Sequence, residues 1–90
     1  MNFIEKIRKI TKINKEKIRT RGTKKIIKKI KKQIQHAAKE GKYETIYNVP
    51  SDLLFYKSNI EYYFNKEGFT CYVKKSWREY LVEISWKEEE

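Results

Sequence analysis

Few side chains in this chain combine the chemistry and the spacing that a metal or catalytic site requires. His36 is the only histidine, and the positions three and four residues from it hold no Cys, Asp or second His. A metal site needs three or four such ligands. We therefore predict that no metal ion is bound, and we interpret His36 as an exposed histidine on a lysine-rich helix.

Neither the single cysteine nor the carboxylates form a recognisable catalytic group. Cys71 lies on the inward side of an alternating strand pattern, where cysteine behaves as a small buried hydrophobe. Asp52 fits the first turn of a helix, and Glu79 and Glu83 fit the outer face of a strand. No glycine belongs to a phosphate-binding loop. We predict a protein that is not an enzyme and needs no cofactor.

Charge divides the chain into two unlike halves. The net charge is +10, but residues 1–42 carry 16 of the 22 Lys and Arg side chains against three acids. Residues 43–90 carry six basic and nine acidic side chains and, except for Phe3, all the aromatic residues. The first half is therefore predicted to provide a contact surface, and the second half most of the core.

The clearest predicted element is a helix over residues 24–40 with one apolar and one basic side. Its apolar stripe is Ile26, Ile27, Ile30, Ile34, Ala37 and Ala38. Lysines three and four residues apart repel each other, and no glutamate relieves this repulsion before Glu40. Such a surface can neutralise phosphate groups and release counterions. The predicted nucleic-acid contacts are Arg19, Arg21, Lys24, Lys25, Lys28, Lys29, Lys31, Lys32 and Lys39.

A separate helix is predicted before this one. Its apolar side comprises Phe3, Ile4, Ile7, Ile10 and Ile18, together with Asn14. Ile13 falls on the other side, which indicates a break or kink at residues 13–15. Gly22 suits the end of this helix, and Thr23 suits the N-cap of the next. Residues 1–22 either pack on the domain or are mobile, and an unpacked first helix could pair with a second chain.

The second half reads as strand, helix, strand, strand. Residues 43–47 and 69–73 show the alternating side-chain pattern of strands, and residues 80–86 form the last strand. Gly41 and Gly68 end helices, and residues 75–78 form the turn between the last two strands. A helix is predicted from Ser51, as its N-cap, to Glu67. The predicted fold is α+β: N-terminal helices followed by βαββ, with a small three-stranded sheet packed against helices. A winged helix is the alternative, in which the segment 51–67 splits at Ser58 because of its capping-box spacing.

Length and composition limit the organisation of the protein. Ninety residues suffice for one domain, predicted over residues 1–86, with 87–90 as a charged tail. No apolar run is long enough to span a membrane. The single cysteine fits a reducing compartment. We therefore expect a cytoplasmic protein.

Aromatic side chains in the second half offer a second contact surface. Tyr43, Tyr47, Tyr72 and Tyr80 lie on predicted strands, from which exposed rings can stack on unpaired bases. Tyr62 and Tyr63 are expected to pack inside. Trp77 is the aromatic residue expected to be exposed. The predicted secondary contacts in this turn are Lys74, Lys75, Trp77 and Arg78.

Several positions between Ile26 and Trp86 resemble small proteins encoded by bacteriophages. The resemblance rests on Ile34, Ala37-Ala38, Gly41-Lys42, Pro50, Gly68-Phe69 and the closing Ile84-Ser85-Trp86. It implies a phage accessory or virion-associated protein that acts in the bacterial cytoplasm. It brings no catalytic residues.

Two functions follow as hypotheses. The first is binding of DNA or RNA with low sequence specificity, since lysine acts as a point charge and does not read bases through a bidentate fork. The alternative is a phage accessory protein that binds and modulates a host protein or takes part in virion assembly.

Overall fold

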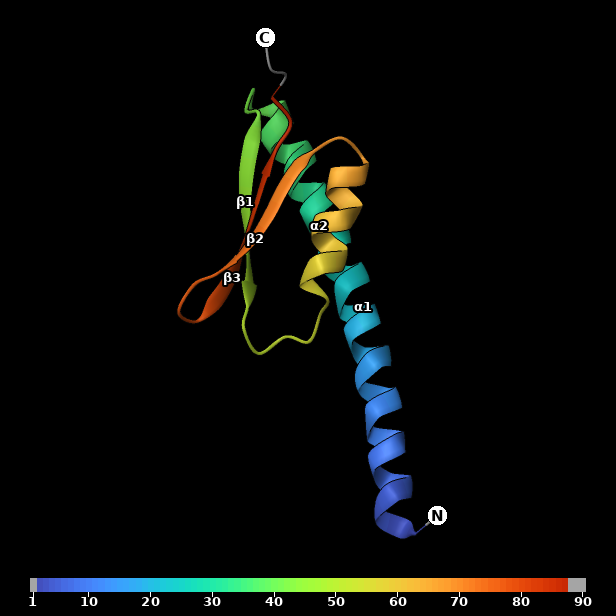
Figure 1. Cartoon of the computed structure of the whole chain (residues 1–90). Coiled ribbons are helices and arrows are strands. Elements are labelled where there is room, and N and C mark those ends of the chain that lie inside the picture. The colour runs from blue at the N-terminus through green and yellow to red at the C-terminus, as the bar shows by residue number, and fades with distance from the viewer. Residues whose placement is uncertain (1, 88–90) are drawn as a thin grey trace.

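The computed structural model describes residues 2–87, which form two helices and a three-stranded sheet (Figure 1). The elements follow the order α1 (Phe3–Lys39), β1 (Glu44–Pro50), α2 (Lys57–Lys66), β2 (Thr70–Lys75) and β3 (Glu79–Ser85). The α+β class and the βαββ order of the second half are therefore confirmed. Of the predicted tail, residues 88–90 lie outside the described residues.

α1 is one uninterrupted helix of 37 residues, so the prediction of two helices separated by a break is wrong. At a rise of about 1.5 Å per residue it is about 55 Å long, which accounts for most of the 61 Å long axis of the molecule. Asn2 caps its start, because its side-chain oxygen accepts a hydrogen bond from the Glu5 N–H at 3.0 Å. Gly41, with a φ of 80°, follows its end as predicted.

Gly22 and Thr23 serve tertiary contacts in the middle of α1 instead of ending one helix and starting another. The backbone carbonyl of Leu54 occupies the space that a Cβ atom at position 22 would need. The buried Thr23 hydroxyl donates to the Arg19 carbonyl and accepts from the Tyr56 N–H, each at 2.7 Å. These contacts fasten the segment between β1 and α2 onto α1.

The sheet is antiparallel, and both helices pack on one of its faces. Its strand order is β1-β3-β2, with Val49 opposite Tyr80 and Cys71 opposite Ile84. α1 packs against β1 and α2, and α2 packs against β2 (Figure 1). The core between these layers is formed by Ile26, Ile30, Val49, Ile60, Phe64, Cys71, Val73, Val82 and Ile84. Alternation of apolar and polar residues thus identified the inward side of β2 and β3. In α1, Ala38 belongs to the predicted apolar stripe but is exposed.

The connection after β1 is extended and turned, not helical. The Ser51 N–H donates to the Arg78 carbonyl at 3.2 Å, which ties the start of the segment to the β2–β3 turn. The next helix therefore begins at Lys57, with Tyr56 and not Ser51 as its N-cap, and Leu53, which the predicted helix would bury, is exposed. The winged-helix alternative requires a separate helix starting at Ser51, and that segment forms none.

Asn65 attaches α2 to the edge strand β2. Its side-chain amide donates to the Cys71 carbonyl at 3.1 Å and accepts from the Cys71 N–H at 3.2 Å, as a neighbouring strand would. Asn65→Ala removes both bonds, together with the bond that the same amide donates to the Glu61 carbonyl, and is expected to lower the free energy of unfolding by about 1.5 kcal/mol. Urea denaturation followed by circular dichroism measures this loss. An unchanged unfolding midpoint would contradict the assigned contact.

Cys71 is predicted to be chemically silent in the folded protein. Burial raises the pKa of its thiol to about 11, with a smaller contribution from the Glu61 carboxylate. A thiol with a raised pKa holds less of the reactive thiolate at every pH below that value. An aromatic disulfide reagent at pH 8 should therefore modify the thiol at the rate of global unfolding. Rapid modification of the native protein would show that the side chain is accessible.

Candidate nucleic-acid interface

The exposed side of the second half of α1 carries a group of seven lysines, here called the lysine face. Ile26, Ile30 and Ala37 face the sheet and the core, so the opposite side of the same helix faces solvent. Every member of the lysine face is exposed. The members are Lys24, Lys25, Lys28, Lys29, Lys31, Lys32 and Lys39.

The lysine face is not neutralised by acidic side chains of the described chain. Among residues 2–87 the ion pairs join His36 to Glu40, Lys42 to Glu40, and Lys74 to Glu83. None of them involves a member of the lysine face. Lys31 instead lies over the ring of Tyr63, with its Nζ atom 4.8 Å from the ring centre. The positive charge of this surface is therefore available to an external partner.

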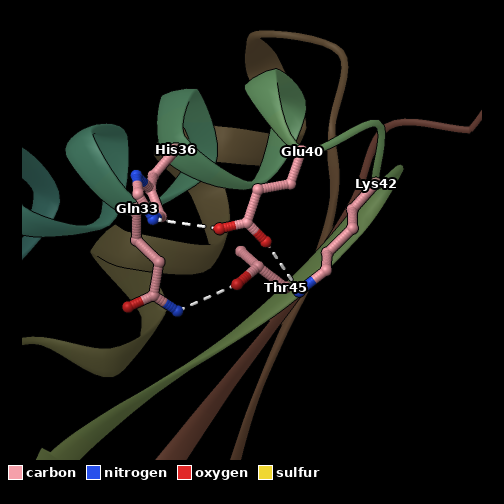
Figure 2. Close-up of polar contacts among 5 residues, drawn as sticks. All are labelled: Gln33, His36, Glu40, Lys42 and Thr45. Atoms are coloured by element: carbon pink, nitrogen blue, oxygen red, sulfur yellow. Dashed lines mark hydrogen bonds and ion pairs between the residues drawn. The ribbon is translucent and has the colours of Figure 1, made fainter.

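A cluster of polar contacts closes the C-terminal end of the lysine face (Figure 2). Glu40 accepts from His36 and from Lys42, each at 3.0 Å. The hydrogen bond and charge of Lys42, and then His36, lower the pKa of Glu40, so its carboxylate stays charged. Gln33 donates to the Thr45 hydroxyl at 2.9 Å and to the Ile46 carbonyl at 2.6 Å, which fixes α1 to β1. His36 is exposed, as interpreted from the sequence.

The two arginines that precede the lysine face differ in their surroundings. Arg19 is half-buried, and its guanidinium lies 5.9 Å from the ring centre of Tyr56. Arg21, two residues further along α1, is exposed. Arg21 therefore extends the positive surface towards the N-terminus, whereas Arg19 is partly occupied by contacts within the protein.

A groove between α1 and α2 adds residues that sequence reasoning missed. Its lining includes Lys24 and Ile27 of α1 and Tyr62 and Lys66 of α2. Tyr62 was expected to be packed inside, yet it is 68 % exposed and lies beside the Lys66 ammonium. The signal was present in the sequence: Tyr62 is two residues from the buried Ile60, a spacing that places it on the opposite side of a helix.

The predicted secondary contacts lie apart from the lysine face, at the β2–β3 turn. This turn projects away from α1 (Figure 1). Trp77 is 88 % exposed, which confirms its predicted exposure, and the Arg78 guanidinium lies 5.7 Å from its ring centre. Lys74 pairs with Glu83 at 3.1 Å, and the Lys75 ammonium lies 5.9 Å from the Tyr80 ring centre. Lysine face and turn thus form two separate surfaces.

The strand tyrosines divide between the two faces of the sheet. Tyr47 and Tyr80 pack against the core. Tyr72 is exposed and stands across from Glu83 on the sheet face that no helix covers, whereas Tyr43 is exposed just before β1 begins. Of the four candidates for base stacking, the fold therefore leaves two available.

Two further features of the described chain bear on its chemistry. Within residues 2–87, no three His, Cys, Asp or Glu side chains gather closely enough to hold a metal ion. Neither helix of that part has an apolar stretch of the length needed to cross a bilayer.

Comparison with known proteins gives one match. The family model described as Phage T4 Y10B protein matches residues 4–86. No curated protein and no solved structure matches the chain. The family match agrees with the resemblance to small phage-encoded proteins, although it does not single out the motifs on which that resemblance was based. Because the match covers nearly all of the sequence, the chain belongs to the phage T4 Y10B protein family.

Proposed function

We propose that this phage protein binds nucleic acid through the lysine face of α1 and works by binding, not by catalysis. The observation that supports the proposal is the group of exposed lysines on one uninterrupted helix, without a carboxylate partner in residues 2–87. A protein that neutralises phosphates with lysine releases condensed counterions, which drives the association.

The chemistry of the lysine face favours contact with the phosphate backbone and little reading of sequence. Lysine is a flexible point charge, whereas base recognition in the major groove relies on bidentate partners such as arginine. Arg21 is the exposed arginine next to the lysine face. The neighbouring groove offers Tyr62 as a ring on which an unpaired base can stack, with Lys24 and Lys66 near its phosphates.

Fluorescence anisotropy with short labelled DNA duplexes tests this proposal. Two duplexes of unrelated sequence are expected to bind with affinities that agree within a factor of about three, because backbone contacts carry no sequence information. A single-stranded oligonucleotide is expected to bind as well, and Tyr62→Ala should weaken that binding alone. Absence of binding to every probe at low salt would refute the proposal.

Exposure of Trp77 supports a second candidate function, the docking of this accessory protein on a host or virion protein. A fully exposed tryptophan flanked by Arg78 has the composition of an interface anchor. Such a complex should survive moderate salt and weaken at least tenfold in Trp77→Ala. Co-purification of the tagged protein from infected cells, with nuclease treatment, measures this. A partner that is lost with nuclease would instead favour the first function.

A further inference from the structure

The N-terminal part of α1, residues 3–18 and here called the N-terminal arm, is a helix without a partner in the fold. All of its residues are exposed, and it extends past the rest of the molecule (Figure 1). Its large apolar side chains are between 44 % and 79 % exposed: Phe3, Ile4, Ile7, Ile10, Ile13 and Ile18. An isolated helix of this length is marginal in water. The family match begins at residue 4, so the arm belongs to the family's common sequence.

Apolar residues of the N-terminal arm follow the seven-residue repeat of a coiled coil, in which positions a and d form the contact seam. With Ile7 and Asn14 at position a, Phe3 and Ile10 fall at position d. Ile4 and Ile18 fall at position e, which borders the seam on one side. The seam is thus apolar from residue 3 to residue 10, and two polar residues follow, Asn14 at position a and Lys17 at position d.

Ile13 and Asn14 select a parallel pairing with an identical helix. Ile13 lies off the main stripe, at position g, and in a parallel pair a g residue contacts the e residue five positions later in the other chain. That residue is Ile18. Asn14 would face the Asn14 of the second chain, and an asparagine at position a fixes register and favours two strands. A parallel pair therefore accounts for both residues that do not fit a simple stripe.

Most charges of the N-terminal arm lie outside the seam; the exception is Lys17 at position d, and Lys6 borders the seam at position g. Arg8, Lys9, Lys12 and Lys15 occupy positions b, c and f, which point away from a partner helix, as do Glu5 and Glu16. The second half of α1 uses those same outward positions for the core, since Ile26 lies at f and Ile30 at c. The folded body therefore lies on the side of α1 opposite the seam and does not obstruct a second arm.

We propose that the N-terminal arm is a dimerisation element, and that two copies of this chain pair in parallel through Phe3, Ile7, Ile10 and Asn14. The pairing weakens from Lys17 at position d and ends where Arg21 and Lys24 follow at a and d, because like charges there repel. Beyond that point the two α1 helices diverge, with their lysine faces directed towards a shared space. Salt should therefore strengthen the pairing by screening this repulsion.

Sedimentation equilibrium of the full chain tests the pairing. At moderate salt the mass should rise with concentration from 11.0 kDa to twice that value. Ile7→Asp with Ile10→Asp should remain at the monomer mass at all concentrations, with an unchanged thermal unfolding midpoint of the body. A wild-type protein that stays monomeric at every concentration and salt overturns the proposal. A monomer whose arm binds anionic vesicles also overturns it and identifies the arm as a membrane-surface helix.

Oxidative cross-linking tests the register. Asn14→Cys should form an interchain disulfide, because its a position brings the two thiols together across the seam. Lys12→Cys is the matched control at an outward position, and the wild-type chain, with Cys71 as its only thiol, gives the baseline. Equal cross-linking at positions 12 and 14 overturns the parallel register. Neither experiment requires nucleic acid, so its failure would leave the proposed function standing.

Discussion

Reversing the charge of two lysines in the centre of the lysine face, in Lys28→Glu/Lys32→Glu, is expected to weaken duplex binding about 100-fold at ~0.1 M salt. Each lysine–phosphate contact releases about 0.9 counterions, which corresponds to roughly an eightfold gain in affinity at that salt concentration. Loss of two contacts accounts for roughly 60-fold, and repulsion by the new carboxylates adds to it. Fluorescence anisotropy with a labelled duplex measures the change.

The control for this variant is a double charge reversal with the same net charge outside α1. Lys57 and Lys87 are exposed, and neither belongs to the lysine face. Lys57→Glu/Lys87→Glu is expected to weaken binding less than about fivefold, because only the long-range field of the protein changes. Equal losses in both variants would mean that net charge, and not the lysine face, determines binding. Circular dichroism of each variant confirms that the fold is retained.

Replacing Gly22 by alanine is expected to destabilise the protein by about 2 kcal/mol, although alanine is the better helix former by about 1 kcal/mol. The new Cβ atom would overlap the Leu54 carbonyl oxygen, which is backbone and cannot rotate away. The segment between β1 and α2 would have to move, and the Thr23–Tyr56 hydrogen bond at its end would be strained. Overpacking of this kind costs about 1–3 kcal/mol.

Thermal and urea denaturation of Gly22→Ala measure that effect, with Thr20→Ala as the matched control. Thr20 lies in the same part of α1 and is exposed, and its hydroxyl bonds only to the Glu16 carbonyl of its own helix. Thr20→Ala should be neutral or slightly stabilising. If Gly22→Ala were also stabilising, the close approach of Leu54 to α1 would be wrong.

Local patterns were sufficient to predict the sheet and the lysine face. Strict alternation placed Cys71, Val73, Val82 and Ile84 on the inward side, where all four are buried. The apolar stripe around Ile26 likewise fixed which side of α1 faces solvent. In both cases the side of the element on which apolar residues recur is also the side that is buried in the core, so the pattern alone predicts it.

The boundary of α1 could not be predicted, because its signals serve contacts between distant segments. Gly22 and Thr23 have the residue types of a helix end and a helix start. In the fold, Gly22 instead leaves space for the Leu54 carbonyl, and the Thr23 hydroxyl accepts a hydrogen bond from the Tyr56 N–H. The apolar stripe also changes sides between Ile18 and Ile26. That change resembles a break, yet one uninterrupted helix accommodates it because the N-terminal arm does not pack on the sheet.

The late start of α2 has a similar cause. Pro50, Ser51 and Asp52 are typical of a helix N-terminus. In the fold, the Ser51 N–H instead bonds to Arg78, and the segment continues extended until Tyr56 reaches Thr23. The groove was missed for a different reason: Tyr62 was expected inside, although its spacing from the buried Ile60 places it on the other side of α2. Tyr62 and Lys66 were therefore absent from the predicted contact surface.

The dependence of duplex affinity on salt concentration tests most directly whether the lysines of α1 meet phosphate. If five of them neutralise phosphates, a plot of log K against log salt should be linear with a slope of about −4 to −5. In Lys28→Glu/Lys32→Glu the slope should become shallower by about two. Binding that is insensitive to salt, or that keeps its slope in this variant, would contradict the role assigned to the lysine face.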